Sequence, residues 1–267
     1  MSDFLSTMAA SSLLRADGVR SRFGVARLTS KASSARPVIP LDPAESGFGV
    51  IAEAKLASPS QGRLAPEGDS TELVVEMAAE LAGAGAVALS ILTEPERFDG
   101  DLAHLEAVTR ATDIPVMRKD FLVDPIQVLE ARATGASGVL LISRILEPRL
   151  LVEMADLVRD LGMFCLVEVF DESDLDAADV VFDRDVLVGV NARNLHTLQI
   201  DPSSHERLAG RLPDHLPLVA ESGINTAEDA GRVAGLGYGL ALVGTALTTA
   251  VDPAGLVSAM SAAGKAA

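Results

Sequence analysis

The sequence predicts an α/β protein, a single (β/α)8 TIM barrel with an N-terminal helical extension, and three observations support this fold class. Eight short apolar runs rich in β-branched residues recur along the chain, and segments with helical periodicity separate them. Continuous apolar strands that alternate with amphipathic helices are typical of a parallel sheet covered by helices. The length of 267 residues suits one such barrel, which commonly has about 250 residues.

The predicted strands follow one another at near-regular intervals from residue 47 onward. They cover residues 47–55, 86–92, 114–121, 137–143, 164–169, 186–193, 216–222 and 240–246. Eight such units close on themselves as a barrel, whereas an open doubly wound sheet, the alternative fold, usually has fewer strands in an irregular order. We therefore expect one catalytic barrel domain over residues 48–267.

The segments between the strands carry ordinary helix signals. Four of the predicted helices cover residues 70–86, 101–112, 124–136 and 147–162. A capping residue or an early proline opens three of them, at Ser70, at Asp124-Pro125 and at Glu147-Pro148. Residues 1–47 precede the first strand, and their helical pattern followed by a Ser-, Ala- and Pro-rich stretch predicts an extension laid over one barrel mouth.

Composition argues against several classes of function. Asp and Glu number 38 against 22 Lys and Arg, so the net charge of −16 disfavours nucleic acid and anionic membranes as partners. The one cysteine, Cys165, permits neither an internal disulfide nor a multi-thiolate zinc site, and we expect it to be a buried structural thiol. The four histidines lack metal-ligand spacing. With no secretory signal pattern and no long apolar run, we predict a cytoplasmic protein without a bound metal.

Ionisable side chains gather where the predicted strands end. In a parallel barrel the carboxyl ends of the strands form one mouth, where active sites lie. Side chains two residues apart face the same side of a strand, which places these residues at the mouth: Glu53, Lys55, Lys119, Glu168, Asn191, Arg193 and Glu221. Any one of them alone is compatible with a solvated loop. Together they predict a proton-transfer pocket that accepts an anion, in which close Lys–Glu pairs shift each other's pKa and partial burial can bring the pKa of a lysine down toward neutrality.

The last two strands carry a second signal. Ser222-Gly223 follows the seventh strand and Gly244-Thr245 follows the eighth. Small residues at these two places let backbone N–H groups approach a phosphate, the usual anion site of such barrels. Tight packing of helix against strand is the alternative explanation for the small residues. We expect the ligand to be a phosphorylated small molecule.

These motifs resemble the indole-3-glycerol-phosphate synthase family. The resemblance covers residues 48–250, in the family's order. The matching segments are Ile51-Ala52-Glu53-Ala54-Lys55, Ser58-Pro59-Ser60, Leu92-Thr93-Glu94, Phe98-Asp99-Gly100, Arg118-Lys119-Asp120-Phe121, Leu166-Val167-Glu168-Val169, Gly189-Val190-Asn191-Ala192-Arg193-Asn194-Leu195, Glu221-Ser222-Gly223-Ile224 and Leu242-Val243-Gly244-Thr245. Each motif alone occurs in other phosphate-binding barrels, but the set is specific.

The resemblance implies a cofactor-free reaction of tryptophan biosynthesis. In it, 1-(2-carboxyphenylamino)-1-deoxyribulose 5-phosphate closes its ring and loses CO₂ and water to give indole-3-glycerol phosphate. The catalytic residues implied are Lys119 as general acid, Glu168 as the second acid–base group, Glu53 and Asn191 as its orienting pair, and Lys55 near both phosphate and reacting hydroxyl. How the two lysines divide the acid steps stays open.

The resemblance also implies a set of binding residues. Those for the substrate are Ser58, Phe98, Phe121, Arg193, Leu195, Glu221 and Ser222; those for the phosphate are Lys55, Gly223, Gly244 and Thr245. Phe98 and Phe121 would form apolar walls around the anthranilate ring, although Phe121 is equally compatible with ordinary core.

The chain departs from the family pattern at Gln61, where relatives often carry lysine, and at Ser143-Arg144, where small apolar residues are usual. Three alternatives stay open on sequence grounds: a paralogue for a substituted anthranilate derivative, another phosphate-binding barrel such as a sugar-phosphate isomerase, and a barrel that only binds. The protein is expected to be a monomer or weak homo-oligomer.

Overall fold

Eight parallel strands close into a barrel in the computed structural model, which describes residues 4–43, 47–58, 62–64, 68–194, 197 and 199–267. The barrel strands are β1 (Gly49–Ala54), β4 (Ala88–Leu92), β5 (Val116–Lys119), β6 (Gly138–Ile142), β7 (Phe164–Val169), β8 (Leu187–Asn191), β9 (Leu218–Glu221) and β10 (Leu240–Val243). Strand β1 pairs with β4 on one side and with β10 on the other, both parallel. The predicted barrel is confirmed, and the closed ring excludes the open doubly wound sheet.

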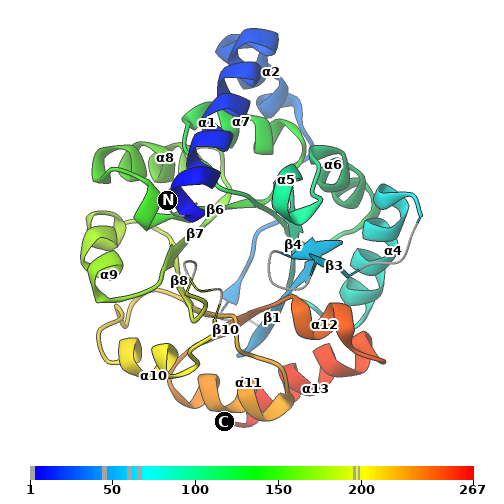
Figure 1. Ribbon diagram of the computed structural model, residues 1–267, viewed down its shortest axis with the longest axis vertical. Helices are drawn as coiled ribbons and strands as arrows, with labels where there is room; N and C mark the ends of the chain where they lie inside the picture. Colours follow the sequence, from blue (N-terminus) through cyan, green and yellow to red (C-terminus); the bar gives the residue numbers. More distant parts are fainter. Residues whose placement is uncertain (1–3, 44–46, 59–61, 65–67, 195–196, 198) are drawn as a thin grey trace.

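Helices surround the barrel (Figure 1). The longer ones are α4 (Ser70–Gly83), α6 (Leu102–Ala111), α7 (Pro125–Ala133), α8 (Pro148–Asp160), α9 (Glu172–Ala178), α10 (Ser203–Ala209), α11 (Ala227–Gly235) and α13 (Pro253–Ala266). Short helical turns lie at α5 (Pro95–Phe98), η1 (Ser143–Ile145), η2 (Asp179–Val181) and α12 (Thr245–Thr249). Asp124 caps α7 as predicted, but Asp69 rather than Ser70 caps α4, since its carboxylate accepts from the N–H groups of the first turn.

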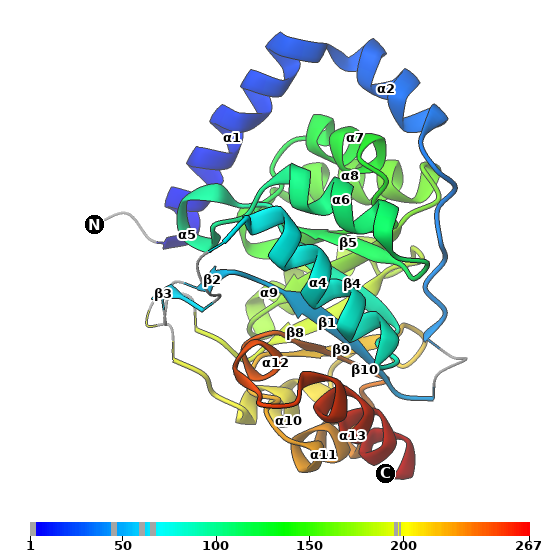
Figure 2. The ribbon, with the colours of Figure 1, turned by 90° about the vertical axis from the view of Figure 1, so that its right-hand side faces the viewer.

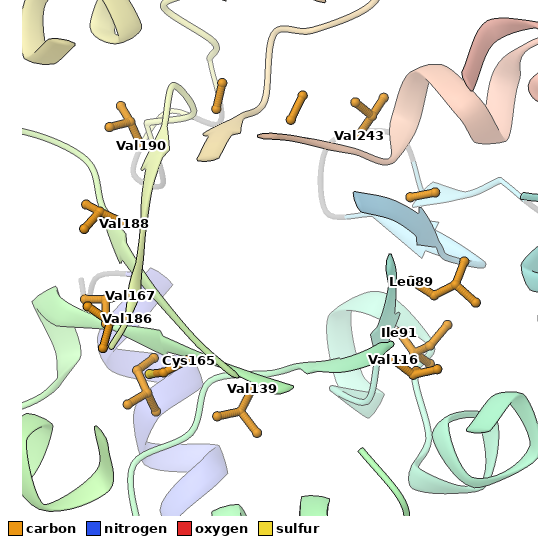
Figure 3. Packing of buried hydrophobic residues seen from close by; sticks show 14 of the residues in the cluster. Leu89, Ile91, Val116, Val139, Cys165, Val167, Val186, Val188, Val190 and Val243 are labelled. Atoms are coloured by element: carbon orange, nitrogen blue, oxygen red, sulfur yellow. The ribbon is translucent and has the colours of Figure 1, made fainter. Parts of the chain in front are cut away.

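Strand alternation sorts the side chains into two layers. Outward side chains pack beneath the helices in the main apolar cluster, and Figure 3 shows Val139, Cys165 and Val188 on this outer side. Inward side chains form a second cluster inside the barrel, to which Ile51 and Leu166 belong. Glu53 and Glu168 stand two residues further along the same strands, so they face inward one layer nearer the carboxyl end. The apolar layer thus forms the floor of a polar mouth.

Two helices precede the barrel and form an arch outside it (Figure 2). They are α1 (Phe4–Phe23) and α2 (Val25–Ser34). Both contact α7, and Ala16 and Leu28 share a small apolar cluster with Ile126 and Leu129 of that helix. The start of α1 reaches the mouth of the barrel, where Phe4 lines the cavity, while the rest of the extension runs along the outside.

Several strands end earlier than predicted because the chain turns sharply at the mouth. Strand β9 ends at Glu221, and the next two residues, Ser222 and Gly223, have φ values of 63° and 76°. Strand β10 ends at Val243, and α12 begins at Thr245. A small antiparallel hairpin of β2 (Ala57–Ser58) and β3 (Gly62–Arg63) follows β1, and this hairpin was not predicted.

Candidate active site

A cavity of about 440 Å³ opens at the carboxyl ends of the barrel strands. All predicted site residues that the structure describes line it: Glu53, Lys55, Ser58, Phe98, Lys119, Phe121, Glu168, Asn191, Arg193, Glu221, Ser222, Gly223, Gly244 and Thr245. Leu195 lies outside the described residues, as does Gln61. The parallel direction of the strands brings these side chains together, because each strand delivers its last inward residues to the same mouth.

Two lysine–glutamate pairs form the centre of the site. Lys55 Nζ lies 2.8 Å from Glu53 Oε1, and Lys119 Nζ lies 3.9 Å from Glu168 Oε2. Burial by itself raises the pKa of Glu53, but the positive charges of Lys55 and Lys119 outweigh it and hold this pKa below its ordinary value. Glu53 is therefore ionised at neutral pH.

The pKa of Lys119, the lysine of the second pair, shifts in the direction opposite to the one that burial alone would give. Burial lowers the pKa of Lys119, but the carboxylates of Glu168, Glu53 and Glu221 outweigh it and raise this pKa above its ordinary value. Of the two effects expected for a lysine in this pocket, the charge of neighbouring glutamates therefore outweighs burial at Lys119, and its pKa does not move toward neutrality. Its ammonium keeps its proton at neutral pH, and the group is suited to act as an acid.

Glu168 is held by a side-chain amide. Asn191 Nδ2 donates to Glu168 Oε2 at 3.0 Å, while Asn191 Oδ1 accepts the backbone N–H of Arg193 at 2.9 Å. Since both ends of the amide are engaged, its donor end is fixed toward the carboxylate. Ser143 Oγ donates to the backbone carbonyl of Glu168 at 3.0 Å, so this departure from the family pattern supports the strand that carries the acid–base group.

Glu221 differs from the other two inward glutamates. Burial, and then the nearby charge of Glu168, raise the pKa of Glu221 well above its ordinary value. Its carboxyl group therefore keeps its proton to a higher pH than an ordinary glutamate does. The imidazole of His205, from α10, lies 3.2 Å from the backbone carbonyl of Glu221 and packs edge-on against Tyr238 below the strand end.

Two glycines, Gly189 and Gly244, leave space for the acidic side chains of the site. Gly189 was not among the predicted site residues. A Cβ on Gly189 would lie 2.2 Å from Glu221 Oε1. A Cβ on Gly244 would lie 2.2 Å from Glu53 Oε1 and 2.8 Å from Lys55 Nζ. The signal for Gly189 was present, since it stands two residues before Asn191 and so faces the same side of β8.

Three phenylalanines form an apolar wall on the side of β4 and β5. The Phe121 ring lies 6.0 Å from Phe4, edge to face, and 6.1 Å from Phe98. Phe121 belongs to the inner apolar cluster and also lines the cavity, so it is core and wall at once. Phe4 comes from the N-terminal helix and was not among the predicted site residues, because no local pattern links it to the barrel.

The second departure from the family pattern, Arg144, is engaged at the rim. Its guanidinium group donates to Asp171 and, at 2.9 Å, to Asp174, and it stacks over the Phe170 ring at 4.9 Å. Arg144 is therefore held by α9 and its cap. His196, the histidine nearest to the mouth in the sequence, lies outside the described residues.

Two searches for other functional features cover the described part of the chain. No group of three or more His, Cys, Asp or Glu side chains there is placed to hold a metal ion. Among the same residues, no helix combines the length and apolar character needed to cross a membrane.

The fold and the site together define a (β/α)8-barrel enzyme with lysine and glutamate as its candidate acid–base groups. A sequence model of the indole-3-glycerol phosphate synthase family matches residues 11–260. An indole-3-glycerol phosphate synthase of Mycobacterium sp. (strain KMS) is 43% identical over 256 residues, which cover 94% of this chain and 92% of the relative. One from Rhodococcus opacus (strain B4) is 46% identical over 209 residues, 78% of this chain and 76% of the relative. The chain belongs to the indole-3-glycerol phosphate synthase family.

Solved structures of low sequence identity share the fold. The 3-hexulose-6-phosphate synthase from Salmonella typhimurium superimposes with a TM-score of 0.65 at 12% identity, covering 81% of this chain and 98% of that one. Tryptophan synthase subunit alpha from Legionella pneumophila str. Paris gives a TM-score of 0.58 at 16% identity, covering 90% of this chain and 98% of that one. At such identities the likeness shows the barrel alone.

Proposed function

We propose that the protein converts 1-(2-carboxyphenylamino)-1-deoxyribulose 5-phosphate into indole-3-glycerol phosphate, CO₂ and water, as a carbon–carbon lyase of tryptophan biosynthesis that needs no cofactor. The observation that carries the proposal is the Lys119–Glu168 pair, 3.9 Å apart in the buried mouth of the barrel. An ammonium group and a carboxylate at this distance supply the acid and the base that the reaction needs. The names of the relatives support the choice of product.

In the first step the ring carbon that bears the carboxylate attacks the ketone carbon. The electrons come from the substrate's own amine, and the ketone oxygen takes a proton from Lys119, whose raised pKa keeps the ammonium charged. The carboxyl group then leaves as CO₂, and its bonding electrons return to the ring system. A correctly placed acid of this kind contributes about 10²–10⁴ in rate.

The second step removes water from the decarboxylated intermediate. Glu168 takes a proton from the ring CH₂ group beside the nitrogen, a lysine ammonium protonates the departing hydroxyl group, and the C–H electrons form the double bond of the indole. Asn191 orients Glu168 through its 3.0 Å hydrogen bond, and ionised Glu53 lies with Lys55, on the opposite side of the mouth. Both lysines line the cavity, so the departing hydroxyl has two candidate donors: Lys55, and Lys119 once its amine has taken up a proton from solvent after the first step.

We assign the aromatic wall to the anthranilate ring and the opposite rim to the phosphate. Phe98 and Phe121 offer apolar faces that exclude water, and Ser58, Arg193, Glu221 and Ser222 line the space between the wall and the rim. The turn at Ser222-Gly223 and the start of α12 at Gly244-Thr245 place small residues and backbone N–H groups at the rim, with Lys55 nearby. A role of Leu195 in binding stays a prediction.

The alternatives fit the site less well. A sugar-phosphate isomerase of this fold would use an Asp or Cys acid–base pair, but Asp120 is held by two arginines and Cys165 faces the helices. A paralogue for a substituted anthranilate derivative would differ in the aromatic wall rather than in the lysines and glutamates. A barrel that only binds has no need of a charged Lys119 beside an oriented Glu168.

Turnover of the proposed substrate tests the function directly. We expect purified protein mixed with 1-(2-carboxyphenylamino)-1-deoxyribulose 5-phosphate to produce indole fluorescence, against a low background because the chain has no tryptophan. Lys119→Met should abolish this signal, and Lys265→Met, on α13 outside the cavity, should keep it. Absence of signal from the folded wild-type protein would refute the proposal, and ring-substituted analogues would then test the paralogue.

Two further properties belong to the proposal. Inorganic phosphate should compete with the substrate, and a lack of competition would refute the phosphate assignment at the rim. We also propose that the protein acts in the cytoplasm as a monomer or weak homo-oligomer, and light scattering after size-exclusion chromatography measures its state of assembly.

A further inference from the structure

An arginine of the N-terminal helix reaches two loops of the active site. Arg15 Nη2 lies 2.7 Å from Asp120 Oδ1, and Arg15 Nη1 lies 3.5 Å from Glu94 Oε1. The Arg15 side chain is 25% exposed, whereas the side chains of Asp120 and Glu94 are 0% and 1% exposed. One guanidinium group on α1 therefore joins the loop after β4 to the loop after β5.

The first of these carboxylates fixes the backbone next to Lys119. Asp120 Oδ1 accepts the N–H of Phe121 at 2.8 Å, and Asp120 Oδ2 accepts Thr93 Oγ1 at 2.8 Å and Arg118 Nη2 at 3.1 Å. Lys119 lies between Arg118 and Asp120 in the chain, so both of its neighbours belong to this network. A shift of Asp120 would move Lys119 relative to Glu168.

The second carboxylate holds the short helix that carries part of the aromatic wall. Glu94 accepts the backbone N–H groups of Glu96, Arg97 and Phe98 at 3.0, 2.7 and 3.2 Å, and it caps α5. The ring of Phe98 then contacts Phe121, which follows Asp120. Both loops held by Arg15 therefore contribute to the same wall.

Charge balance shows what Arg15 adds. Arg118 already pairs with Asp120, and it also pairs with Glu130 Oε2 at 2.9 Å. Without Arg15, Asp120 would share the Arg118 guanidinium group with Glu130, and buried Glu94 would lose the ion pair that Arg15 gives it. A buried carboxylate that loses its cation is costly, and the segment that bears it tends to move toward water.

We propose that Arg15 is a positioning residue for this site: it ties the loops after β4 and β5 together and so holds Lys119 opposite Glu168 and Phe98 against Phe121. The kinetic part of this inference rests on the proposed function. The structural part, the ordering of two loops by a residue of the N-terminal extension, does not depend on it.

The same helix offers a matched control. Arg20 Nη2 lies 2.8 Å from Asp124 Oδ2, so it also anchors α1 to the barrel. Asp124 caps α7 and does not line the cavity. Arg15→Met and Arg20→Met each remove one anchor of α1, but only Arg15→Met releases the two site loops.

The test compares both variants by steady-state kinetics and by amide hydrogen exchange. We expect Arg15→Met to lower kcat/KM by about tenfold or more, since small misplacement of reacting groups has effects of this size. It should also speed exchange at the α5 amides held by Glu94 and at Phe121. Arg20→Met should stay within about twofold of the wild type and keep both loops protected, because the site loops retain their contacts.

A third variant, Arg15→Lys, separates charge from geometry. Its ammonium can pair with Asp120 but cannot span two carboxylates as a guanidinium fork does, so we expect partial recovery of both readouts. Unchanged exchange in Arg15→Met, or equal kinetic losses in Arg15→Met and Arg20→Met, would overturn the proposal. A wild-type protein without turnover would refute the proposed function, and faster loop exchange in Arg15→Met alone would still support the positioning role.

Discussion

Replacing Gly189 by alanine tests whether the space beside β8 positions the acidic groups of the site. The new Cβ would lie 2.2 Å from Glu221 Oε1, 3.0 Å from Leu166 Cδ1 and 3.3 Å from Glu221 Cδ. Ordinary contact begins at about 3.4 Å, so the Glu221 carboxyl group must withdraw by about 1 Å or turn away from Glu168. The carboxyl groups of Glu221 and Glu168 would then no longer keep their relative positions.

Two magnitudes follow from this displacement. Overpacking of a well-packed interior costs about 1–3 kcal/mol in free energy of unfolding, so the melting temperature should fall by several degrees. A misplacement of about 1 Å in an active site costs about 10²-fold in rate. We therefore expect a large fall in kcat with a modest loss of stability, measured by indole fluorescence and by thermal unfolding.

Gly138→Ala is the matched control for packing alone. Gly138 is the first residue of β6, and its Cβ would lie 2.4 Å from the ring of Phe164 on β7, away from the carboxylates. This variant should lose similar stability but keep kcat within about twofold, because no reacting group moves. Adding Glu221→Asp to Gly189→Ala shortens the displaced side chain and should restore part of the stability. Equal kcat values for Gly189→Ala and Gly138→Ala would refute the reasoning.

Three other predictions address the charges of the barrel. Glu168→Gln removes the proposed base and should lower kcat by about 10²–10⁴ while the melting temperature changes little; a kcat near the wild-type value would remove Glu168 from the mechanism. The folded-state pKa of Glu221 is raised, so the contribution of its neutral form to stability is complete below the ordinary pKa of 4.5 and is lost as pH rises through the folded pKa. Urea unfolding should therefore show Glu221→Gln gaining stability relative to the wild type as pH rises above 4.5, and a constant difference would contradict the shift. Burial raises the pKa of the Cys165 thiol to about 12, so a thiol reagent should react slowly with the native protein and release one equivalent on unfolding, whereas rapid native reaction would contradict its burial.

The barrel and most of its mouth could be predicted because both depend on short-range patterns. Alternation along a strand decides which side chains point inward, and the parallel direction of the strands decides that their last residues meet. Glu53, Lys119, Glu168 and Asn191 follow from these two rules, and the structure places all of them in the cavity. These two rules do not predict which residues of the N-terminal helix reach the site, because no periodicity in residues 4–23 indicates which barrel loop the helix contacts.

Ends of strands and caps of helices were predicted less accurately, for a local reason. The segment 216–222 reads as a strand through Ser222, but β9 stops at Glu221 because Ser222 adopts a left-handed backbone conformation at the rim. Likewise Asp69 caps α4 in place of Ser70. Aspartate and serine are both favoured at the start of a helix, so which of Asp69 and Ser70 caps α4 depends on contacts that the sequence does not display.

The sequence by itself determined the class of the fold, the direction in which the polar residues face and the resemblance that the comparisons confirm. The tertiary structure decided the pKa shifts of the site residues and which residues outside the barrel contact the site. Lys119 is half-buried, and its desolvation alone would lower its pKa, but three glutamates from other strands surround it and raise that pKa. Phe4 and Arg15 reach the mouth from a helix outside the barrel. Electrostatic shifts depend on distances between groups that are far apart in the chain, and only the closed barrel sets those distances.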